Sequence, residues 1–490
     1  MNKYFKIILL LSISLFITIG CNDNDDALYQ NSNSEVQNFI WKGLNNYYLW
    51  QDKVEDLADF RFENPYLLND FLVAKGSPEK VFEDLLYFPE SKYKNLNKTV
   101  DRFSVLVDDY EFLENLFQGV RTTSGIVAGY KYRNGVSGPI FGYIKYVLPN
   151  SDAASKGIKR GDIFYAVNGI QLTDENRSSL FANDNFSLDF ATYLNGNITP
   201  NGVTVAFTKS QVTENPVMIN TTFTQGSKKI AYLMYNSFTA NFNVELNNSF
   251  GQIAASNCTD LILDLRYNGG GSIATASYLA SMITGQFNGQ VFASQQWNPR
   301  IQNYFLANDP ESLTNRFTNN IEGQAINSLN LSKVYILTSS GTASASELLI
   351  NGLAPYITVI QIGDKTVGKN VGSITLYDSP NFTKSNANPR HKYAMQPLVL
   401  KTANKSGFGD YQNGLSPNTS NILIEDIGNL GVLGTANEPL LQKALDLISF
   451  RIRAPRLNQS QNLMNANPDS EQISEMYLDK TPKGFSEIFK

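Results

Sequence analysis

Histidine and cysteine are scarce in this sequence. Its 490 residues include one histidine, His391, and two cysteines, Cys21 and Cys258. Zinc and iron sites are built mainly from clusters of these two residue types. No such cluster and no EF-hand spacing occurs, which leaves open only a site made of carboxylates alone. The composition therefore predicts no metal ion or other cofactor.

Charged residues are also few, at 17% of the chain, and lysine and arginine form no block. Proteins that bind nucleic acids carry a basic surface, whereas the net charge here is −5. We therefore expect no nucleic acid among the partners. A length of 490 residues is too great for one ordinary core and predicts two to four domains.

The first twenty residues have the features of a targeting segment. Lys3 and Lys6 precede an apolar run over residues 8–19, which is too short to span a bilayer as a stable helix. The run ends in Gly20-Cys21, which resembles a bacterial lipoprotein processing site, although Thr18 stands where such sites usually carry Leu. The resemblance implies that Cys21 is lipidated and that the protein is an outer-membrane lipoprotein of the cell envelope. Plain secretion with cleavage nearby is the alternative.

An acidic stretch follows over residues 22–26. It resembles the export signal that sends Bacteroidetes lipoproteins to the cell surface, and it is equally compatible with a solvated tether. The periplasmic face and the cell surface therefore both stay open. If Cys21 is lipidated, the mature chain has only Cys258 and no disulfide, so its stability must come from the size of its core.

Hydrophobic spacing divides the rest of the chain into three structured parts. Apolar residues recur every three to four positions from Val36 to Tyr48, a second helix begins at Ser77-Pro78, and a third is expected over residues 109–117. We predict a multi-domain α+β fold with a helical domain, a β domain and an α/β core. The predicted boundaries are a signal peptide at 1–20, a tether at 21–34, a helical domain at 35–117, a β domain at 118–212, the core at 213–450 and a tail at 451–490.

The β domain is predicted from strand patterns near residues 126–130 and 141–147. The stretch from Pro149 to Gly169 reads as a short helix, a Gly-Asp turn, a strand and an Asn-Gly turn, and it closely resembles the corresponding segment of PDZ domains. The resemblance implies a groove that binds a peptide by β-augmentation, with loop amides holding its terminal carboxylate. The residues near that loop are Gly125, Ile126 and Val127. A PDZ-like scaffold without peptide binding is the alternative.

Strands and helices alternate in the core. Strands are expected at 230–235, 261–265, 334–337 and 357–362, and helices at 243–255, 277–283, 345–353 and 438–450. This alternation is typical of a mixed or parallel sheet covered by helices. The nearly continuous apolar run at 261–265 predicts a strand buried on both faces.

Three glycines, residues 269–271, follow that buried strand in the run Asp264-Leu265-Arg266-Tyr267-Asn268-Gly269-Gly270-Gly271. Glycine lets the backbone approach a ligand closely, and the free amides of such a turn can form an oxyanion hole. A tight strand-to-helix turn is the structural alternative.

Ser344 lies between an expected strand and an expected helix, where backbone amides and the helix dipole favour a nucleophile. With Glu347 it also matches a capping box, which is the structural alternative. Lys369 follows 25 residues later, and a buried lysine can replace histidine as a base. The run 363–370 nearly matches a phosphate-binding loop, but it lacks both the hydroxyl after the lysine and the following helix, so nucleotide binding is not expected.

Together these motifs resemble the S41 peptidases, the C-terminal (tail-specific) processing proteases. The resemblance runs from about Gly125 to Phe450 and leaves the helical domain and the last forty residues outside it. It implies a ClpP/crotonase-like peptidase core in which Ser344 is the nucleophile and Lys369 the base.

Further site residues follow from the same resemblance. It assigns the oxyanion hole to the amides of Ala345 and Gly270. A shift of one residue in the motif would place the second amide at Gly269 or Gly271 instead. Thr366 matches a supporting position near the dyad. Ser373 stands where the family usually carries a glutamine that orients the lysine, which puts the support of Lys369 in question.

The function expected from this resemblance is a serine endopeptidase with a Ser-Lys dyad, which cleaves unfolded or C-terminally recognised proteins in the cell envelope. Polypeptide substrates and the membrane are then the partners, and the oligomeric state stays open. A catalytically decayed lipoprotein that binds peptides through its PDZ-like domain is the alternative, and a structural member of an envelope complex is a third. His391 lies in a polar run and is expected to be an exposed loop histidine without a catalytic role.

Overall fold

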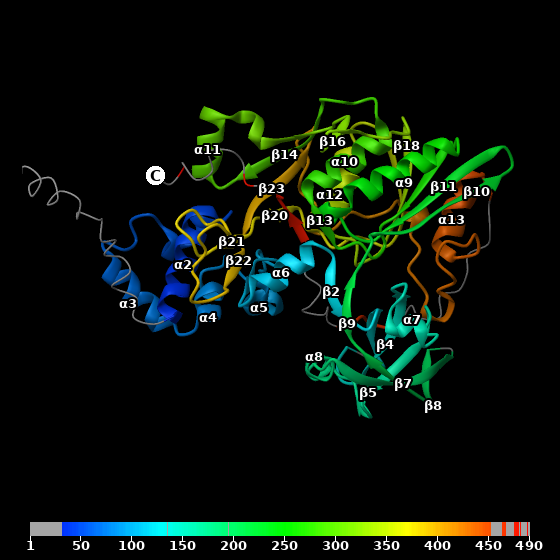
Figure 1. Ribbon diagram of the computed structural model, residues 1–490, viewed down its shortest axis with the longest axis horizontal. Coiled ribbons are helices and arrows are strands. Elements are labelled where there is room, and N and C mark those ends of the chain that lie inside the picture. Colours follow the sequence, from blue (N-terminus) through cyan, green and yellow to red (C-terminus); the bar gives the residue numbers. More distant parts are fainter. Residues whose placement is uncertain are drawn as a thin grey trace, which may run out of the picture.

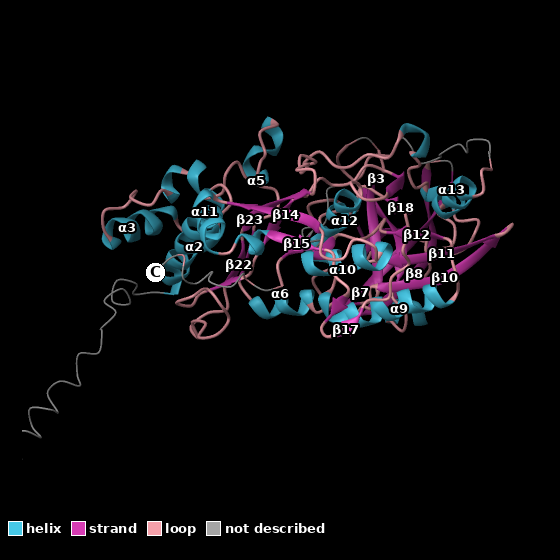
Figure 2. Ribbon diagram, turned by 90° about the horizontal axis from the view of Figure 1, so that it is seen from above, coloured by secondary structure: helices cyan, strands magenta, loops and turns pink. Residues whose placement is uncertain are grey.

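The computed structural model describes residues 32–134, 136–194, 196–451, 463–466, 475–479, 481 and 488. The predicted signal peptide and Cys21 lie outside these residues. Figure 1 shows a helical part at one end, a β part that projects below, and a large α/β part. Figure 2 shows the same molecule from above, with α2, α3 and α11 gathered at one end and the strands of the α/β part running from the middle to the other end.

In the helical part, α3, α4 and α6 each have an N-cap side chain that accepts a backbone hydrogen bond. Its elements are α2 (Ser32–Tyr47), α3 (Pro65–Lys75), α4 (Pro78–Asp84), α5 (Glu90–Tyr93), β1 (Val105–Val107) and α6 (Tyr110–Phe117). The prediction of α4 is confirmed, and the side chain of its N-cap Ser77 accepts a hydrogen bond from the Lys80 amide. α2 begins at Ser32, whereas the helical domain was predicted from residue 35.

The β part is an antiparallel sheet with two one-turn helices. Its elements are β2 (Val120–Thr123), β3 (Ile126–Tyr132), β4 (Ile140–Val147), α7 (Asp152–Ser155), β5 (Ile163–Val167), β6 (Ile170–Gln171), α8 (Arg177–Leu180), β7 (Asn185–Leu194), β8 (Asn197–Thr208) and β9 (Ser210–Thr213). The strand order is β3-β4-β5-β7-β8, so β3 and β8 are the edges. One face packs a core that includes Ile140, Phe164 and Leu188.

A five-stranded sheet forms the first layer of the α/β part. Its strands, in spatial order, are β10 (Val217–Gln225), β11 (Lys228–Tyr235), β12 (Asp260–Asp264), β18 (Lys333–Thr338) and β19 (Thr358–Gly363). The last four run parallel. β12 is buried along its whole length, as its apolar run predicted.

Helices cover both faces of this sheet. The elements are α9 (Asn243–Ala255), α10 (Ile273–Thr284), α12 (Ala345–Leu353) and α13 (Pro439–Ile448). Alternate residues of β11 and β12 pack with α9, α10 and α12 on one face and with α13 on the other. The chain therefore builds the helix-covered mixed sheet that the alternation predicted.

A second sheet lies beside the first. Its strands, in spatial order, are β13 (Gly270–Ser272), β24 (Glu475–Tyr477), β20 (Val371–Ser373), β23 (Leu398–Asn404), β14 (Val291–Trp297) and β15 (Thr314–Arg316). The remaining elements are α11 (Pro299–Asn308), β16 (Asn320–Ile321), β17 (Gln324–Ala325), β21 (Leu376–Tyr377) and β22 (Ala394–Gln396). β1 of the helical part pairs with β22, so the two parts share a small sheet.

β24 lies in the tail after residue 450, for which the sequence predicts no element. It pairs parallel with β13 on one side and with β20 on the other, and Met476 and Tyr477 are buried. Three residues in a polar stretch carry no readable strand pattern, so the sequence alone does not reveal this strand.

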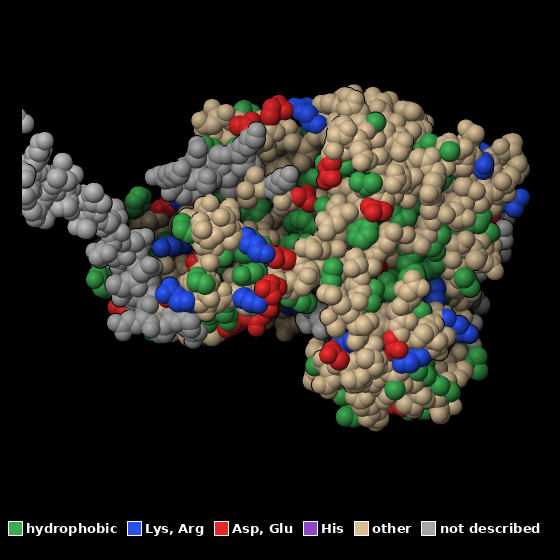
Figure 3. All heavy atoms as spheres, in the orientation of Figure 1, with side chains coloured by type: hydrophobic (Ala, Val, Ile, Leu, Met, Phe, Trp, Pro, Cys, Tyr) green, Lys and Arg blue, Asp and Glu red, His purple; other side chains and the backbone are tan. Residues whose placement is uncertain are grey.

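Lys and Arg side chains are interspersed with Asp and Glu on the face shown in Figure 3. Among the described residues, no helix combines the length and apolar character that membrane spanning requires.

Candidate active site

Ser344 lies at the N-terminus of α12, at the end of the turn that follows β18. Its backbone has φ 66° and ψ −117°, and its side chain is 0% exposed. The Ser344 amide donates to Glu347 Oε2 at 2.8 Å, and the Leu348 amide donates to the Ser344 carbonyl at 2.8 Å. The capping box predicted as the structural alternative is thus present. It holds the serine in a backbone region that L residues rarely adopt.

The buried carboxylate of Glu347 joins the Ser344 turn to the loop that contains Thr366, Gly368 and Lys369. Besides the Ser344 amide, Oε2 accepts from the Lys369 amide at 2.8 Å. Oε1 accepts from the Gly368 amide at 2.7 Å and from Thr366 Oγ1 at 2.5 Å. Burial raises the pKa of Glu347, and these hydrogen bonds oppose that rise. Since Ser344 N and Lys369 N share one oxygen, they lie at most twice the hydrogen-bond length apart.

Lys369 lies in the loop between β19 and β20 and is 2% exposed. Its Nζ is 5.0 Å from the ring centroid of Phe103, which comes from the helical part. The neighbouring Arg102 donates to the Gly368 carbonyl at 2.8 Å and to the Gln412 carbonyl at 3.2 Å. The helical part therefore helps to shape the loop that carries the lysine. No local sequence pattern predicts this contact, because it joins residues more than 260 positions apart.

The glycine turn is bound to the Ser344 turn through Asn268. The Asn268 carbonyl accepts from the Ala343 amide at 3.1 Å and from Ser346 Oγ at 3.2 Å. Its side chain donates to the Tyr235 carbonyl at 2.8 Å and accepts from the Gly270 amide at 2.9 Å. The two turns predicted to form the site are therefore neighbours. The Gly270 amide points at Asn268 in this structure, so it can serve an oxyanion only after releasing that oxygen.

The last residue of the glycine turn, Gly271, must be glycine. Gly271 has φ 137°, and a Cβ there would collide with the Phe238 carbonyl. Gly271 bridges to Phe238 in the backbone, and the Phe238 amide donates to the Gly270 carbonyl at 2.8 Å. The other predicted oxyanion donor, Ala345, is the first residue of α12 and is buried.

The two predicted supporting residues have different partners. Thr366 bonds to Glu347 and accepts from the Leu415 amide at 2.7 Å. Ser373 Oγ reaches Gln396 Oε1 at 2.8 Å and the Met476 carbonyl at 3.2 Å. Gln396 comes from β22 and escaped sequence reasoning, because a distant strand supplies it. The hydroxyl of Ser373 is thus tied to a glutamine from elsewhere in the chain.

His391 differs from its prediction in one respect. Its side chain is only 7% exposed and lies 2.9 Å from Asp378 Oδ2, so the expectation of an exposed histidine is wrong. The ring also contacts the side chain of Tyr393 and accepts from the Tyr393 amide at 3.2 Å. Within the described residues, no group of His, Cys, Asp and Glu is arranged to hold a metal ion.

The predicted peptide-binding residues are in the β part, away from the Ser344 turn. Gly125 has φ 92° and precedes β3, and the Leu148 amide donates to its carbonyl at 2.8 Å. Ile126 and Val127 open β3 and pair with Val147 and Tyr146 of β4. They lie at the start of an edge strand, where a peptide can add to the sheet.

A buried ionic network connects the β part to the core next to the glycine turn. Arg266 is fully buried and bonds to Asp264 at 2.7 Å and to Glu438 at 2.6 Å. Glu425 contacts Arg266 at 3.2 Å and Arg160 of the β part at 2.6 Å. Burial on its own raises the pKa of Glu425, but the charges of Arg160 and Arg266 lower it to about 2.

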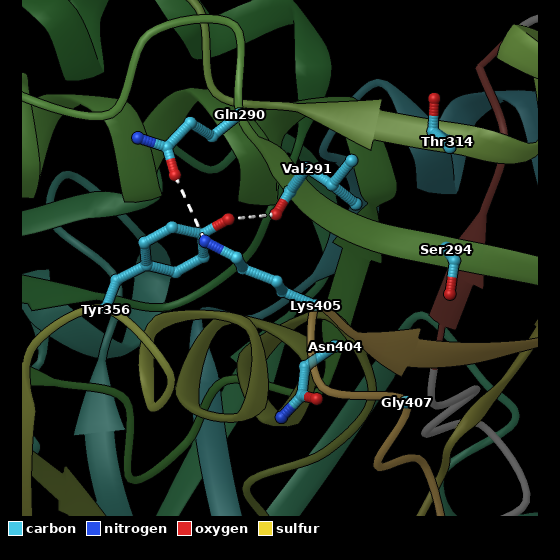
Figure 4. Close-up of a pocket in the computed structure, with 8 residues that line it drawn as sticks. All are labelled: Gln290, Val291, Ser294, Thr314, Tyr356, Asn404, Lys405 and Gly407. Carbon is cyan, nitrogen blue, oxygen red and sulfur yellow. Dashed lines mark hydrogen bonds between the residues drawn. The ribbon is translucent and has the colours of Figure 1, made fainter.

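A pocket of about 500 Å³ opens elsewhere, between β14, β15 and the turn after β23. Figure 4 shows Tyr356 donating to the Val291 carbonyl, at 2.6 Å, and Lys405 reaching Gln290, at 3.2 Å. None of the predicted site residues lines it.

Comparison with known families bears on this geometry. Residues 229–380 match the model of peptidase family S41. The S41 region contains the glycine turn, Ser344, Glu347 and Lys369. Residues 35–105 match the model of the peptidase S41 N-terminal domain. The resemblance therefore extends into the helical part, which the sequence motifs had placed outside it.

Individual relatives agree with the S41 match. The chain is 25% identical over 227 residues to a carboxyl-terminal-processing protease of Picosynechococcus sp., covering 46% of this chain and 50% of that protein. It is 24% identical over 237 residues to the chloroplastic C-terminal processing peptidase of Tetradesmus obliquus, covering 46% and 47%. The chain thus spans about half the length of the curated relatives it matches.

A solved structure shares the fold over most of the chain. It comes from Bacteroides fragilis NCTC 9343 and is provisionally described as an S41 protease. The TM-score is 0.62 at 23% identity, with 84% of this chain and 97% of that chain covered. The S41 peptidase fold, with mixed α/β content, is therefore present here.

Proposed function

We propose that this protein is a serine endopeptidase in which Ser344 is the nucleophile and Lys369 the general base. The observation that carries the proposal is the shared carboxylate oxygen of Glu347, which accepts from the amides of both residues. This contact fixes a serine at a helix N-terminus beside a buried lysine, within the S41 region.

The reaction follows from these positions. Lys369 takes the proton of Ser344 Oγ as the oxygen attacks the peptide carbonyl, and the lysine then protonates the leaving amine. Water hydrolyses the acyl-enzyme, with Lys369 again removing a proton, and Ser344 recovers its hydrogen. The Ala345 amide and one amide of the glycine turn stabilise the oxyanion.

We assign the substrates to polypeptides recognised near their C-termini through the β part. The support is the PDZ-like sequence pattern and the edge strand β3, which begins at Ile126 beside the loop glycine Gly125. The names of the curated relatives, carboxyl-terminal-processing proteases, point the same way.

We also propose that Cys21 carries a lipid that anchors the protein in the outer membrane of the cell envelope. The support is the sequence alone, since residues 1–31 lie outside the described structure. Labelling of cells with radioactive palmitate should mark the wild-type chain and not the Cys21→Ser variant. Equal label in both chains contradicts the assignment.

The test of the peptidase is digestion of an unfolded protein with an apolar C-terminus, read by mass spectrometry. Wild type should release fragments, whereas Ser344→Ala, Lys369→Ala and Lys369→Arg should not, because arginine keeps the charge and cannot act as a base. Lys365→Ala is the matched control, since that lysine is exposed in the same loop. Full activity in Lys369→Ala, with loss in His391→Ala, overturns the dyad.

A second candidate is a peptide-binding lipoprotein without catalysis. The observation that favours it is closure of the site, because Ser344 and Lys369 are both shielded from solvent and the Gly270 amide is bound to Asn268. In that case no variant and no wild-type chain releases fragments, while C-terminal peptides still bind.

A further inference from the structure

The outer edge of β3 is occupied by a distant piece of the same chain. Residues 463–466 lie along it in antiparallel orientation, with Asn465 opposite Lys131. The Tyr132 amide donates to the Met464 carbonyl at 3.0 Å, and the Ala466 amide donates to the Tyr130 carbonyl at 3.1 Å. We name residues 463–466 the edge segment. It adds to the sheet in the way that a bound peptide does.

The edge segment has two apolar anchors that face opposite sides of the sheet. Ala466 is 8% exposed and packs in the core of the β part with Tyr132 and Ile140. Leu463 packs on the other face, in the cluster of Phe141 and Ile427. Between them, Met464 is 54% exposed and Asn465 is exposed. Packing therefore restricts the residue type only at Leu463 and Ala466.

A lysine fixes the beginning of the edge segment. Lys131 Nζ donates to the Leu463 carbonyl at 2.9 Å. Burial lowers the pKa of Lys131, while the nearby carboxylates of Asp364 and Glu425 oppose that change. Both carboxylates belong to the α/β part, so the edge segment lies where the β part meets the core.

The edge segment is attached far more weakly than β24, which follows it in the chain. β24 pairs with a strand on each side, and its residue Met476 is fully buried. The edge segment pairs on one side only, through two backbone hydrogen bonds and two anchors. Such a contact can open without disturbing the sheets, because stability is not uniform across a fold.

We propose that the β3 edge is a peptide-binding site whose resident ligand is the edge segment, and that polypeptides with an apolar residue three positions before a small apolar residue compete for it. This deepens the proposed function, on which it rests for the nature of the competing ligand. A ligand on the same chain acts at an effective concentration of about millimolar. A competing polypeptide must therefore bind strongly or be locally concentrated.

The polarity of the edge segment fits this role. Because it runs antiparallel to β3, its chain direction leads from Tyr132 toward Gly125. A peptide bound in the same direction places its C-terminal end toward Gly125, Ile126 and Val127. The self-ligand and the competing polypeptide thus use one path, and they exclude one another.

Binding of a synthetic probe tests the competition. The probe is a fluorescein-labelled peptide with the sequence of residues 461–470, QNLMNANPDS, titrated onto the full chain carrying Ser344→Ala so that it is not cleaved. Adding Ala466→Asp to the chain places a charge in the apolar core and displaces the edge segment. We expect this variant to bind the probe at least about tenfold more tightly than its parent, from the loss of the competing ligand.

Met464→Asp is the matched control, because it adds the same charge two residues earlier, at an exposed position. It should bind the probe as the parent does. A probe with aspartate at the position of Ala466 should not bind to any of these chains. Equal probe affinity in the Ala466→Asp chain and its parent overturns the proposal, as does equal tightening by Met464→Asp.

Hydrogen exchange separates displacement from misfolding. In Ala466→Asp the Tyr132 amide should exchange at least about tenfold faster, since it loses the Met464 carbonyl. The amides of β5, in the middle of the sheet, should be unchanged. Slow exchange at Tyr132 in this variant contradicts the proposal, and fast exchange throughout β5 shows that the variant has unfolded the β part.

In that last case Ala466→Pro replaces the aspartate variant, because proline removes the amide that bonds to Tyr130 and leaves the core without a charge. Unchanged probe affinity in Ala466→Pro then overturns the proposal. Neither readout depends on peptide cleavage. A chain that binds as expected but never cleaves contradicts only the proposed peptidase, and a chain that cleaves with unchanged probe affinity contradicts only this inference.

Discussion

At Glu347 the two carboxylate oxygens accept from three backbone amides and one hydroxyl, whereas at Glu425 they meet two guanidinium groups and the phenol of Tyr267. Burial dominates at Glu347 and raises its pKa. At Glu425 burial acts in the same direction, but the arginine charges prevail and the pKa falls to about 2.

The two carboxylates therefore have different structural roles. Around Glu347 the hydrogen-bond donors are uncharged amides and one hydroxyl. They orient the backbones of Ser344 and Lys369 relative to the carboxylate without any cation beside it. Paired charges at Glu425 hold together segments from the β part and the core, where attachment matters more than direction. Buried ion pairs of this kind are costly to break from one side.

Arg266→Met breaks the charged region and should have the largest effect. It leaves Asp264 and Glu438 buried without their shared cation, which should lower the free energy of unfolding by about 3–5 kcal/mol. Urea denaturation followed by circular dichroism measures it. Arg316→Met, which removes a surface pair with Glu311, should cost about 0–1 kcal/mol. Similar losses in the two variants contradict the distinction.

Glu347→Gln breaks the neutral region. A glutamine has one acceptor oxygen, and its NH₂ group would face amides that already donate. We expect a loss of about 1–3 kcal/mol in unfolding free energy from the unsatisfied donors. Turnover should fall on the order of a hundredfold with KM little changed, because the serine and lysine shift relative to one another.

Peptide cleavage assays on folded protein measure this effect. Glu245→Gln, on the exposed side of α9, serves as the control and should leave turnover unaltered. Undiminished turnover in Glu347→Gln would mean that the carboxylate does not position the dyad.

The smallest expected effect is the change in unfolding free energy at low pH, which should differ in sign between Glu347 and Glu425. The pKa of Glu425 is lower in the folded chain, so between about pH 4.5 and 2 the unfolded chain binds more protons and stability falls with falling pH. The raised pKa of Glu347 has the opposite sign, so its share of stability grows as pH falls toward 4.5.

Urea denaturation at pH 7, 6, 5, 4 and 3 tests these signs. Glu425→Gln should flatten the decline of wild type by up to about 1.4 kcal/mol per pH unit. Glu347→Gln should instead steepen the decline above pH 4.5. Shifts of the same sign in both variants contradict the assigned environments.

The sequence predicted helices best where apolar residues recur at helical spacing. α9 and α12 lie at the predicted bounds. α3 escaped because its apolar residues are spread around the helix: Leu68 and Leu72 are buried, whereas Tyr66 and Val73 are exposed. No stripe at helical spacing marks such a segment.

The site was predictable to the extent that its signals are local. The glycine turn, Ser344 and Lys369 each follow a strand, and the fold brings the three turns together. Glu347 was visible only as a cap, since its bonds to Thr366 and Gly368 cross between segments. Arg102, Phe103 and Gln396 reach the site from outside those motifs, and nothing in their surrounding sequence announces it.

The backbone of Ser344 sets the stability of this chain against its chemistry. At φ 66° and ψ −117° a side chain costs about 1–3 kcal/mol, which glycine avoids. A single change to glycine would therefore relieve strain and abolish the hydroxyl at once. If Ser344 is the nucleophile proposed above, replacement by glycine is energetically downhill for a lineage that no longer needs the reaction, and continued use of the hydroxyl keeps a serine there.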